Sequence, residues 1–395
     1  MHDIDAAIAE ITPKLVELRH DLHRHPELAY AETRTAARIV EALGNVPGLD
    51  IRTGLAGTGI LATLNAHREG PCVALRSDMD ALPIQEANTF DHKSEHKGRM
   101  HACGHDGHMA CLVGAARVLS SLADDLPGRV KFVFQPAEEG GGGARRMIEA
   151  GALVDPQVDA AFAFHGWPGI ELGTIHAAPG PLLAAMSAFE IELSGQGTHA
   201  AYPHQGSDVI VTASHIVTQL QTIASRLTDP MEPVVVSVSA IHAGETHNVL
   251  ADRCKMLGTA RALRQETHDE VGGLITKLVE ATAAAFGVGA RVSYLESYPA
   301  LVNDAAATNL VQAAARDVVG DCKLSTVPAP TMGAEDFAYY AQAVPSTMWL
   351  MGLRPPGCDD CPKLHQASFD FRDEVIPAAV AMHCRIVQRF LGEGL

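Results

Sequence analysis

The chain has 395 residues, of which 47% are hydrophobic and 19% are charged, a balance typical of a globular protein long enough for two domains. Its formal net charge of -17 argues against nucleic acid or an anionic membrane as a partner, because both are bound through clustered Lys and Arg. The eight cysteines are too few for a disulfide scaffold, no apolar run could span a bilayer, and the first residues lack the features of a secretory signal. We therefore expect a cytoplasmic protein with reduced thiols.

The first part of the chain, residues 1–184, alternates between strand and helix patterns. Helical periodicity covers residues 4–22, and His20, His23 and His25 lie close together before Pro26. We favour the interpretation that these histidines cap the helix or pack at its end over the alternative that they bind a metal. Apolar strands are predicted at 73–75, 129–135 and 160–164, with helices at 109–122 and 144–150. This alternation predicts an α/β sheet, whose ligand site lies at the carboxyl ends of its strands.

The pattern changes after residue 184. Predicted elements are a strand at 187–193, a helix at 207–226, strands at 234–241 and 255–262, a helix at 266–286 and a strand at 291–296. The order β-α-β-β-α-β is that of a ferredoxin-like α+β domain. We predict that 185–295 form such a domain, inserted into an α/β domain made of 1–184 and 296–395.

Candidate metal ligands stand near the predicted strand ends. Cys103 and His105 are two residues apart, so they could ligate the same ion or adjacent ions, or they could be incidental polar residues of a loop. Glu138 and Glu139 follow the second strand, and adjacent side chains in extended structure point in opposite directions. One carboxylate could thus ligate a metal while the other acts as general base on water, unless the pair is only a solvated turn. His165 follows the third strand.

Seven segments together resemble the aminoacylase-type metallopeptidase family, in its branch of hippurate hydrolases, N-acyl-L-amino acid amidohydrolases and indole-acetyl-amino-acid hydrolases. They occur in family order at 22–28, 76–83, 100–108, 134–140, 197–201, 247–252 and 332–337. The resemblance covers essentially the whole chain. It implies a metallopeptidase-type α/β catalytic domain with an inserted lid and dimerisation domain.

The resemblance also implies roles for individual residues. The metal ligands would be Cys103, His105, Glu139, His165 and His365, with Cys103 bridging two divalent ions. Mixed thiolate, imidazole and carboxylate ligands suit zinc, manganese, cobalt or nickel. Glu138 would be the general base, and Asp80 would orient a ligand, although a strand-end cap explains Asp80 equally well on its own.

In the inserted domain, the resemblance implies that His199 enters the active site of a neighbouring subunit and stabilises the oxyanion. Asn248, Arg261 and Gly333 would contact substrate. The planar guanidinium of Arg261 suits a carboxylate, although on its own this residue could also be a solvent-facing strand residue. The expected protein is a homodimer or homotetramer, assembled through this domain. The expected reaction is hydrolysis of the linear amide bond of hippurate-like or acetyl-amino-acid substrates.

Several alternatives compete with this interpretation. Within the same fold, the enzyme could be a dipeptidase or an aminoacyl-conjugate hydrolase, or the chain could be a non-catalytic binder of N-acyl amino acids. A metal-free thiol hydrolase would use Cys103 as nucleophile with His105 or His108 as base. Cys358 and Cys361 lie outside the family pattern, and we expect two reduced thiols in a loop rather than a metal site or redox pair. A zinc deaminase is disfavoured, because Gly357 rather than proline precedes Cys358.

Overall fold

The structure is a computed structural model that describes residues 4–44, 46–327, 329–358 and 360–395. The prediction that no secretory signal is present falls partly on residues 1–3, outside the described residues. The chain divides into two compact units. The first comprises Met1–Gly180, Val302–Ala329 and Tyr339–Leu395, and the second Pro181–Leu301 and Pro330–Ala338. The predicted boundaries of an independent domain at 185–295 stay a prediction.

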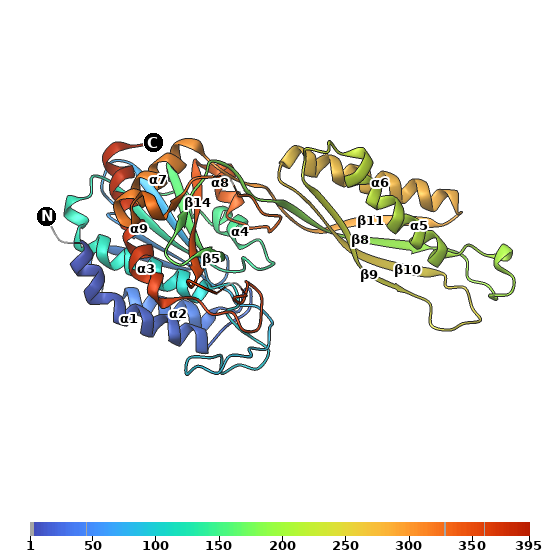
Figure 1. Ribbon diagram of the computed structural model, residues 1–395, viewed down its shortest axis with the longest axis horizontal. Helices are drawn as coiled ribbons and strands as arrows, with labels where there is room; N and C mark the ends of the chain where they lie inside the picture. Colours follow the sequence, from blue (N-terminus) through green and yellow to red (C-terminus); the bar gives the residue numbers. More distant parts are fainter. Residues whose placement is uncertain (1–3, 45, 328, 359) are drawn as a thin grey trace. The chain divides into compact units, whose positions relative to one another are not determined.

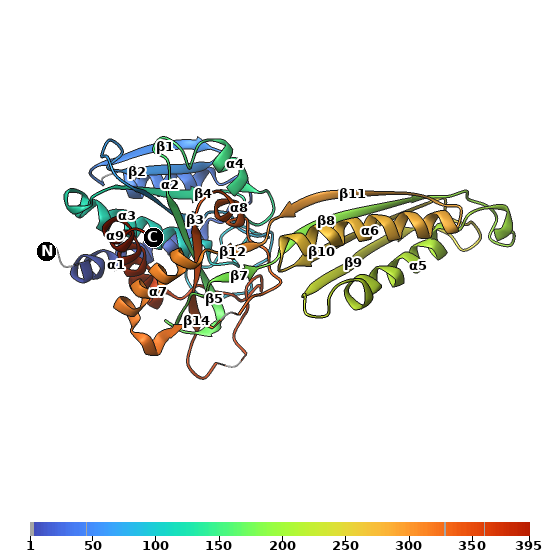
Figure 2. The same cartoon turned by 90° about the horizontal axis from the view of Figure 1, so that it is seen from above.

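The first unit is built on an eight-stranded mixed sheet in the order β1-β2-β4-β3-β5-β14-β6-β13 (Figures 1 and 2). Its strands are β1 (Leu49–Leu55), β2 (Gly59–Leu64), β3 (Cys72–Asp78), β4 (Arg129–Gln135), β5 (Ala160–Glu171), β6 (Ile175–His176), β13 (Leu324–Ser325) and β14 (Ser346–Arg354). β3 pairs in parallel with β4 and β5, and β5 with β14. The carboxyl ends of these four strands therefore lie at the same edge of the sheet.

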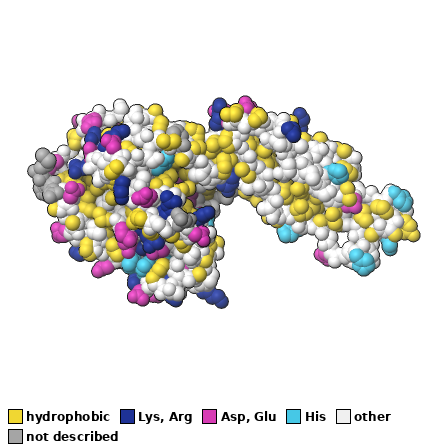
Figure 3. Space-filling view, in the orientation of Figure 1, with side chains coloured by type: hydrophobic (Ala, Val, Ile, Leu, Met, Phe, Trp, Pro, Cys, Tyr) yellow, Lys and Arg dark blue, Asp and Glu magenta, His cyan; other side chains and the backbone are white. Residues whose placement is uncertain are grey.

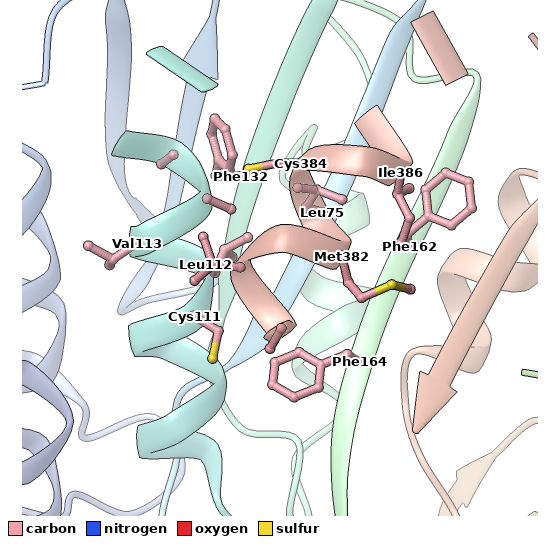
Figure 4. Close-up of a cluster of buried hydrophobic side chains, with 14 of the residues drawn as sticks. Leu75, Cys111, Leu112, Val113, Phe132, Phe162, Phe164, Met382, Cys384 and Ile386 are labelled. Atoms are coloured by element: carbon pink, nitrogen blue, oxygen red, sulfur yellow. The ribbon is translucent and has the colours of Figure 1, made fainter. Parts of the chain in front are cut away.

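The helices of the first unit are α1 (Ile4–Arg24), α2 (Thr33–Leu43), α3 (His105–Ser121), α4 (Gly143–Glu149), α7 (Ala305–Val319), α8 (Ala338–Ala343) and α9 (Ile376–Glu393). α3 and α9 both pack against β3, and α1 packs on both helices. Figure 4 shows Leu112 of α3 and Ile386 of α9 meeting the strand side chains Leu75, Phe132 and Phe162. Burial of this apolar face stabilises the sheet, including the edge at which the carboxyl ends of the parallel strands lie.

The second unit contains a four-stranded antiparallel sheet in the order β11-β8-β10-β9. Its elements are β8 (Ala185–Ser194), α5 (Val209–Thr222), β9 (Val234–Ala243), β10 (Arg253–Ala262), α6 (Gln265–Ala285) and β11 (Gly289–Tyr298). Side chains of β8 alternate between buried and partly exposed along the whole strand, as the period of two predicts. The predicted order β-α-β-β-α-β is confirmed, and so is the α/β class of the first unit.

Two short strands, β7 (Gly180–Leu183) and β12 (Leu301–Asn303), lie where the chain passes from one unit to the other. Among the residues described, no helix is both long and apolar enough to cross a membrane.

Candidate metal centre

The carboxyl edge of the first sheet gathers the predicted ligands. Glu138 and Glu139 follow β4, His165 lies within β5, and His365 lies in the loop after β14. Cys103 immediately precedes Gly104, which begins α3 with a φ of 89°. A Cβ at Gly104 would lie 3.1 Å from the Phe371 ring and would be strained by that φ, so glycine is needed at this turn.

The five predicted metal ligands come together in two overlapping groups. In one, the ligand atoms of Cys103, His105 and His165 lie within 4.8 Å of one another; in the other, those of Cys103, Glu139 and His365 do. Cys103 Sγ is 3.4 Å from His165 Nε2, and His365 Nε2 is 3.2 Å from Glu139 Oε1. Because Cys103 belongs to both groups, its sulfur is placed where a ligand shared by two cations would lie.

The two glutamates are fixed through their backbone by Asp80. Its carboxylate accepts the N–H of Glu138 on one oxygen and the N–H of Glu139 on the other, each at 3.0 Å. The Asp80 carbonyl accepts the Nδ1 proton of His105 at 2.8 Å. Asp80 thus aligns three candidate residues at once, which is more than a strand-end cap would do.

The protonation of the cluster reflects its buried carboxylates. Burial opposes a charge on His105, but Asp78 and Asp80 raise its pKa to about 10. Burial also raises the pKa of the Cys103 thiol well above its ordinary value, and Glu139 and Glu138 add to this effect. A thiol held neutral in this way is a poor nucleophile, which disfavours the metal-free thiol hydrolase.

The residues fit divalent cations. His105 Nε2 is buried without a hydrogen-bond partner, although Asp78, Glu138 and Glu139 each have an oxygen within 3.9 Å of it. The Nδ1 proton of His165 is donated to the Gly166 carbonyl at 2.8 Å, which leaves its Nε2 lone pair facing Cys103. Imidazole nitrogens, a sulfur and carboxylates in one pocket are the donor set of a transition-metal site, and His105 would lose its Nε2 proton on binding a cation.

Asp78 was missed by the sequence analysis, and His108 was named there only as a possible base of a thiol hydrolase. Asp78 accepts a hydrogen bond from Arg76 at 2.8 Å and from His108 Nδ1 at 2.7 Å, and all three side chains are buried. His108 Nε2 in turn accepts the N–H of Gly166 at 2.9 Å. His108 has both ring nitrogens engaged, so it is not available as a general base. The spacing of Asp78 two residues before Asp80, and of His108 three after His105, could have indicated them.

The histidines near the end of α1 pack against other protein groups, and the rings of His20 and His23 both contact His92. His23 contacts Asp106 at 2.9 Å and Glu86 at 3.1 Å. His20 contacts Asp373 at 2.8 Å, and His25 contacts His96 at 3.2 Å. Burial opposes a charge on His23, but Asp106 raises its pKa to about 9. The favoured interpretation of packing is confirmed.

Arg19 of α1 joins the helix to both ligand-bearing segments. Its guanidinium is 1% exposed and donates to Asp106 at 2.9 Å, to Asp373 at 2.7 Å and to the Phe371 carbonyl at 3.1 Å, and it also pairs with Asp370. Asp106 directly follows His105, and the segment 370–373 follows the loop that carries His365. Arg19 therefore ties together the backbone on two sides of the candidate centre.

The remaining predicted residues lie in the second unit. Arg261 on β10 donates a 2.7 Å hydrogen bond to the Met332 carbonyl, which brings it beside Gly333. His199 is exposed and forms an isolated β-bridge with Val249, next to Asn248. Along β10, Arg261 pairs with Met186 at the start of β8, whereas Arg253 pairs with Ser194 at its end. Eight residues of strand, roughly 26 Å, thus separate the Arg261 end of this sheet from the end that leads to His199.

The prediction for Cys358 and Cys361 was wrong. The structure joins them in a disulfide, with Cα atoms 5.6 Å apart, instead of leaving two reduced thiols. A separation of three residues allows a disulfide, a metal site or two free thiols, so the spacing could not decide between them.

Comparisons with known proteins agree with this geometry. Residues 74–389 match the model of peptidase family M20/M25/M40. The chain belongs to this family. It is 40% identical over 346 residues to N-acetyl-L-cysteine deacetylase of Bacillus subtilis, with coverage of 87% of this chain and 82% of that protein. It is 35% identical to IAA-amino acid hydrolase ILR1-like 4 of Arabidopsis thaliana, with coverage of 96% and 86%.

A solved member of the M20 family has the same fold. The Bacillus subtilis YXEP protein, described as a dinuclear metal binding peptidase from the M20 family, matches with a TM-score of 0.83 and 32% identity over 97% of this chain and 99% of that one. The present chain is accordingly an M20 hydrolase with the catalytic sheet and the separate antiparallel sheet of that family.

Proposed function

We propose that this M20 enzyme is a metal-dependent amidohydrolase that cleaves the amide bond of N-acyl amino acids, such as hippurate-like or acetyl-amino-acid substrates. The observation that carries the proposal is the convergence of Cys103, His105 and Glu139 beside Glu138, whose carboxylate reaches within 3.9 Å of His105 Nε2. The relatives named as an N-acetyl-L-cysteine deacetylase and an IAA-amino acid hydrolase support the substrate class.

Cys103, His105 and His165 would hold one divalent cation, and Cys103, Glu139 and His365 the other. Such cations polarise a carbonyl oxygen and lower the pKa of water towards 7. Zinc, manganese, cobalt and nickel all suit this mixed ligand set. Asp80 and Asp78 would hold the ligands in position, since each contacts at least one of them or its backbone.

Glu138 would take a proton from the attacking water and deliver it to the amine that leaves. Glu138 is only 6% exposed, so little bulk water competes for that proton. Its backbone N–H is held by Asp80, which fixes the backbone from which this carboxylate extends. A glutamate that shuttles one proton in this way serves as base in the first step and as acid in the second.

Arg261 and Gly333 would bind the carboxylate of the substrate. The bond from Arg261 to the Met332 carbonyl uses one guanidinium nitrogen and leaves the rest of the fork for a carboxylate. Burial lowers the pKa of Arg261, although an arginine stays charged throughout the physiological range.

His199 and Asn248 would reach the active site of a second copy. Arg261 lies at one end of β10, and the end that leads to His199 and Asn248 is roughly 26 Å of strand away, too far for both ends to contact one small substrate in the same subunit. Ile210 and Val211 of α5 and Ile241 of β9 are each at least 42% exposed, and Figure 3 shows hydrophobic side chains on the surface of this unit. These features support a homodimer, or a homotetramer, built through the second unit.

We expect a mixture of two inactive variants to regain activity. A His199→Ala subunit lacks the oxyanion donor, worth about 10²–10³ in rate, and a Glu138→Gln subunit lacks the base. If His199 acts across subunits, a mixed dimer contains one site with both groups intact. Activity should therefore reach up to about a quarter of wild type after subunit exchange, a fraction that follows from random mixing into dimers. No gain, with exchange verified by native mass spectrometry, would contradict action between subunits.

Metal dependence and substrate class are tested together. Protein stripped by a chelator should lose nearly all hydrolysis, and reloading with zinc, manganese, cobalt or nickel should restore it to differing extents. Each form is assayed on N-acyl amino acids, indole-acetyl conjugates and dipeptides. Preference for dipeptides or conjugates would replace the proposed substrate class, and tight binding without turnover of any compound would favour a non-catalytic binder.

A further inference from the structure

The disulfide lies in the segment that carries His365. β14 ends at Arg354, the disulfide joins Cys358 to Cys361, and His365 follows four residues later. In the M20 mechanism proposed above, this disulfide has no role. It nevertheless lies in the same loop as a candidate metal ligand, four residues before it.

His365 depends on its loop more than the other ligands depend on theirs. Its side chain is 51% exposed, whereas Cys103, His105 and His165 are buried. Its backbone φ is 64°, a value that residues other than glycine rarely adopt. Its backbone N–H is held by the Ala102 carbonyl at 2.8 Å, next to Cys103. A ligand in a disfavoured backbone conformation on an exposed loop stays in place only while the loop is closed around it.

A cavity of about 430 Å³ lies against the disulfide. Its lining includes Trp167, Pro168, Arg354, Cys361, Lys363 and Leu364. Arg354 and Lys363 bring two positive charges, and no carboxylate is among the described residues that line it. The cavity therefore fits a small molecule that carries negative charge and has some apolar surface.

We propose that the Cys358–Cys361 disulfide is a thiol-exchange site, opened by a small anionic thiol bound in this cavity, and that its opening loosens His365 from the metal centre. The inference rests on the role of His365 as a metal ligand in the proposed function. It assigns to this chain a redox-sensitive site outside the hydrolytic reaction.

The exchange takes place in two balanced steps. The thiol loses its proton to solvent, and its thiolate attacks Cys361 Sγ, which forms a mixed disulfide and releases Cys358 as a thiolate that solvent protonates. A second thiolate attacks the sulfur of the first thiol, which frees Cys361 and yields a small-molecule disulfide. Two thiols are oxidised and one protein disulfide is reduced.

The expected consequence is weaker metal retention. Reduction removes the short ring that the disulfide closes, so the loop gains freedom that it must give up again whenever His365 binds metal. Groups that hydrogen-bond a metal ligand are typically worth 10-fold to 100-fold in metal affinity, and a constraint four residues along the chain should act at the lower end of that range. We expect the reduced protein to bind its more weakly held ion about tenfold less tightly.

The test uses full-length, metal-loaded protein with Cys322→Ser, which removes an exposed cysteine outside this loop and should leave metal binding unchanged. The protein is treated with glutathione or with cysteamine at equal thiolate concentration, alkylated, and analysed by intact mass. Two additional alkylated thiols should form, several-fold faster with anionic glutathione than with cationic cysteamine, because Arg354 and Lys363 attract anions. Lys363→Met should reduce that preference.

Metal affinity is measured separately on oxidised protein and on protein that has been reduced with a phosphine, after the phosphine has been removed. A Cys358→Ala/Cys361→Ala protein should match the reduced state and should not respond to phosphine. Equal affinity of the oxidised and reduced forms would overturn the inference, as would equal rates with the two thiols. If reduction changes the metal affinity but no substrate is hydrolysed, the proposed function fails while the exchange site stands. If substrate is hydrolysed but reduction does not change the metal affinity, the exchange site alone fails.

Discussion

A Glu138→Gln enzyme should hydrolyse its substrate about 10²–10⁴-fold more slowly than wild type, the range by which a positioned general base accelerates a reaction. The amide of Gln has the shape of the carboxylate but cannot accept a proton from water. The backbone N–H of residue 138 would still bond to Asp80, so neighbouring Glu139 should keep its place. The loss should therefore appear in kcat while metal content, measured by elemental analysis, stays at the wild-type value.

The matched control is Glu149→Gln. Glu149 lies on α4 of the same unit, is exposed, and pairs only loosely with Arg145 at 3.7 Å. Its replacement should change neither metal content nor rate. A metal-replete Glu138→Gln enzyme with near-wild-type kcat would remove Glu138 from the role of base.

An Arg19→Met protein should be less stable than wild type by about 3–5 kcal/mol, the usual cost of breaking a buried ion pair from one side. Arg19 is fully buried against Asp106, Asp370 and Asp373, and methionine leaves these carboxylates without their shared cation. Because Asp106 is adjacent to His105, metal affinity should fall as well. The measurements are the urea midpoint and the metal dissociation constant.

The difference in stability between the Arg19→Met protein and wild type should be smaller at acid pH. Burial works against ionisation of Asp106, but His23 and Arg19 hold its pKa well below the ordinary value. A depressed carboxyl pKa gives stability that is present above the unfolded value near 4 and is lost as the pH falls below it. Removal of Arg19 weakens that contribution, so the two proteins should differ most near pH 7 and less below about pH 4.

Arg24→Met provides the control on the same helix. Arg24 lies one turn and a residue beyond Arg19, and its guanidinium donates a long 3.4 Å hydrogen bond to the Asp91 carbonyl. Its replacement should cost less than about 1 kcal/mol. Equal urea midpoints for the Arg19 and Arg24 variants would show that the buried guanidinium of Arg19 is not needed for stability.

Regular local patterns were sufficient to predict the order of the strands and helices of the antiparallel sheet. The alternation of 187–193 and the long helical periods on either side of 234–262 correspond to β8, α5, β9, β10, α6 and β11. The C-terminal part was not divided into elements, and β14 illustrates the reason. All but the last of its residues are buried, so the strand has no alternation of apolar and polar side chains for a sequence pattern to detect.

The types of residue in the sequence indicated the chemistry that we propose: an adjacent pair of glutamates, a cysteine two residues before a histidine, and the family motifs around them. Only the tertiary structure decided which groups meet, such as Asp80 with both glutamate N–H groups, Asp78 with His108, and Cys358 with Cys361. These contacts depend on parallel strands that bring their carboxyl ends to one edge and on loops that return to it. Local periodicity carries no information about which distant segments become neighbours, because that choice is made by burial of the whole apolar core.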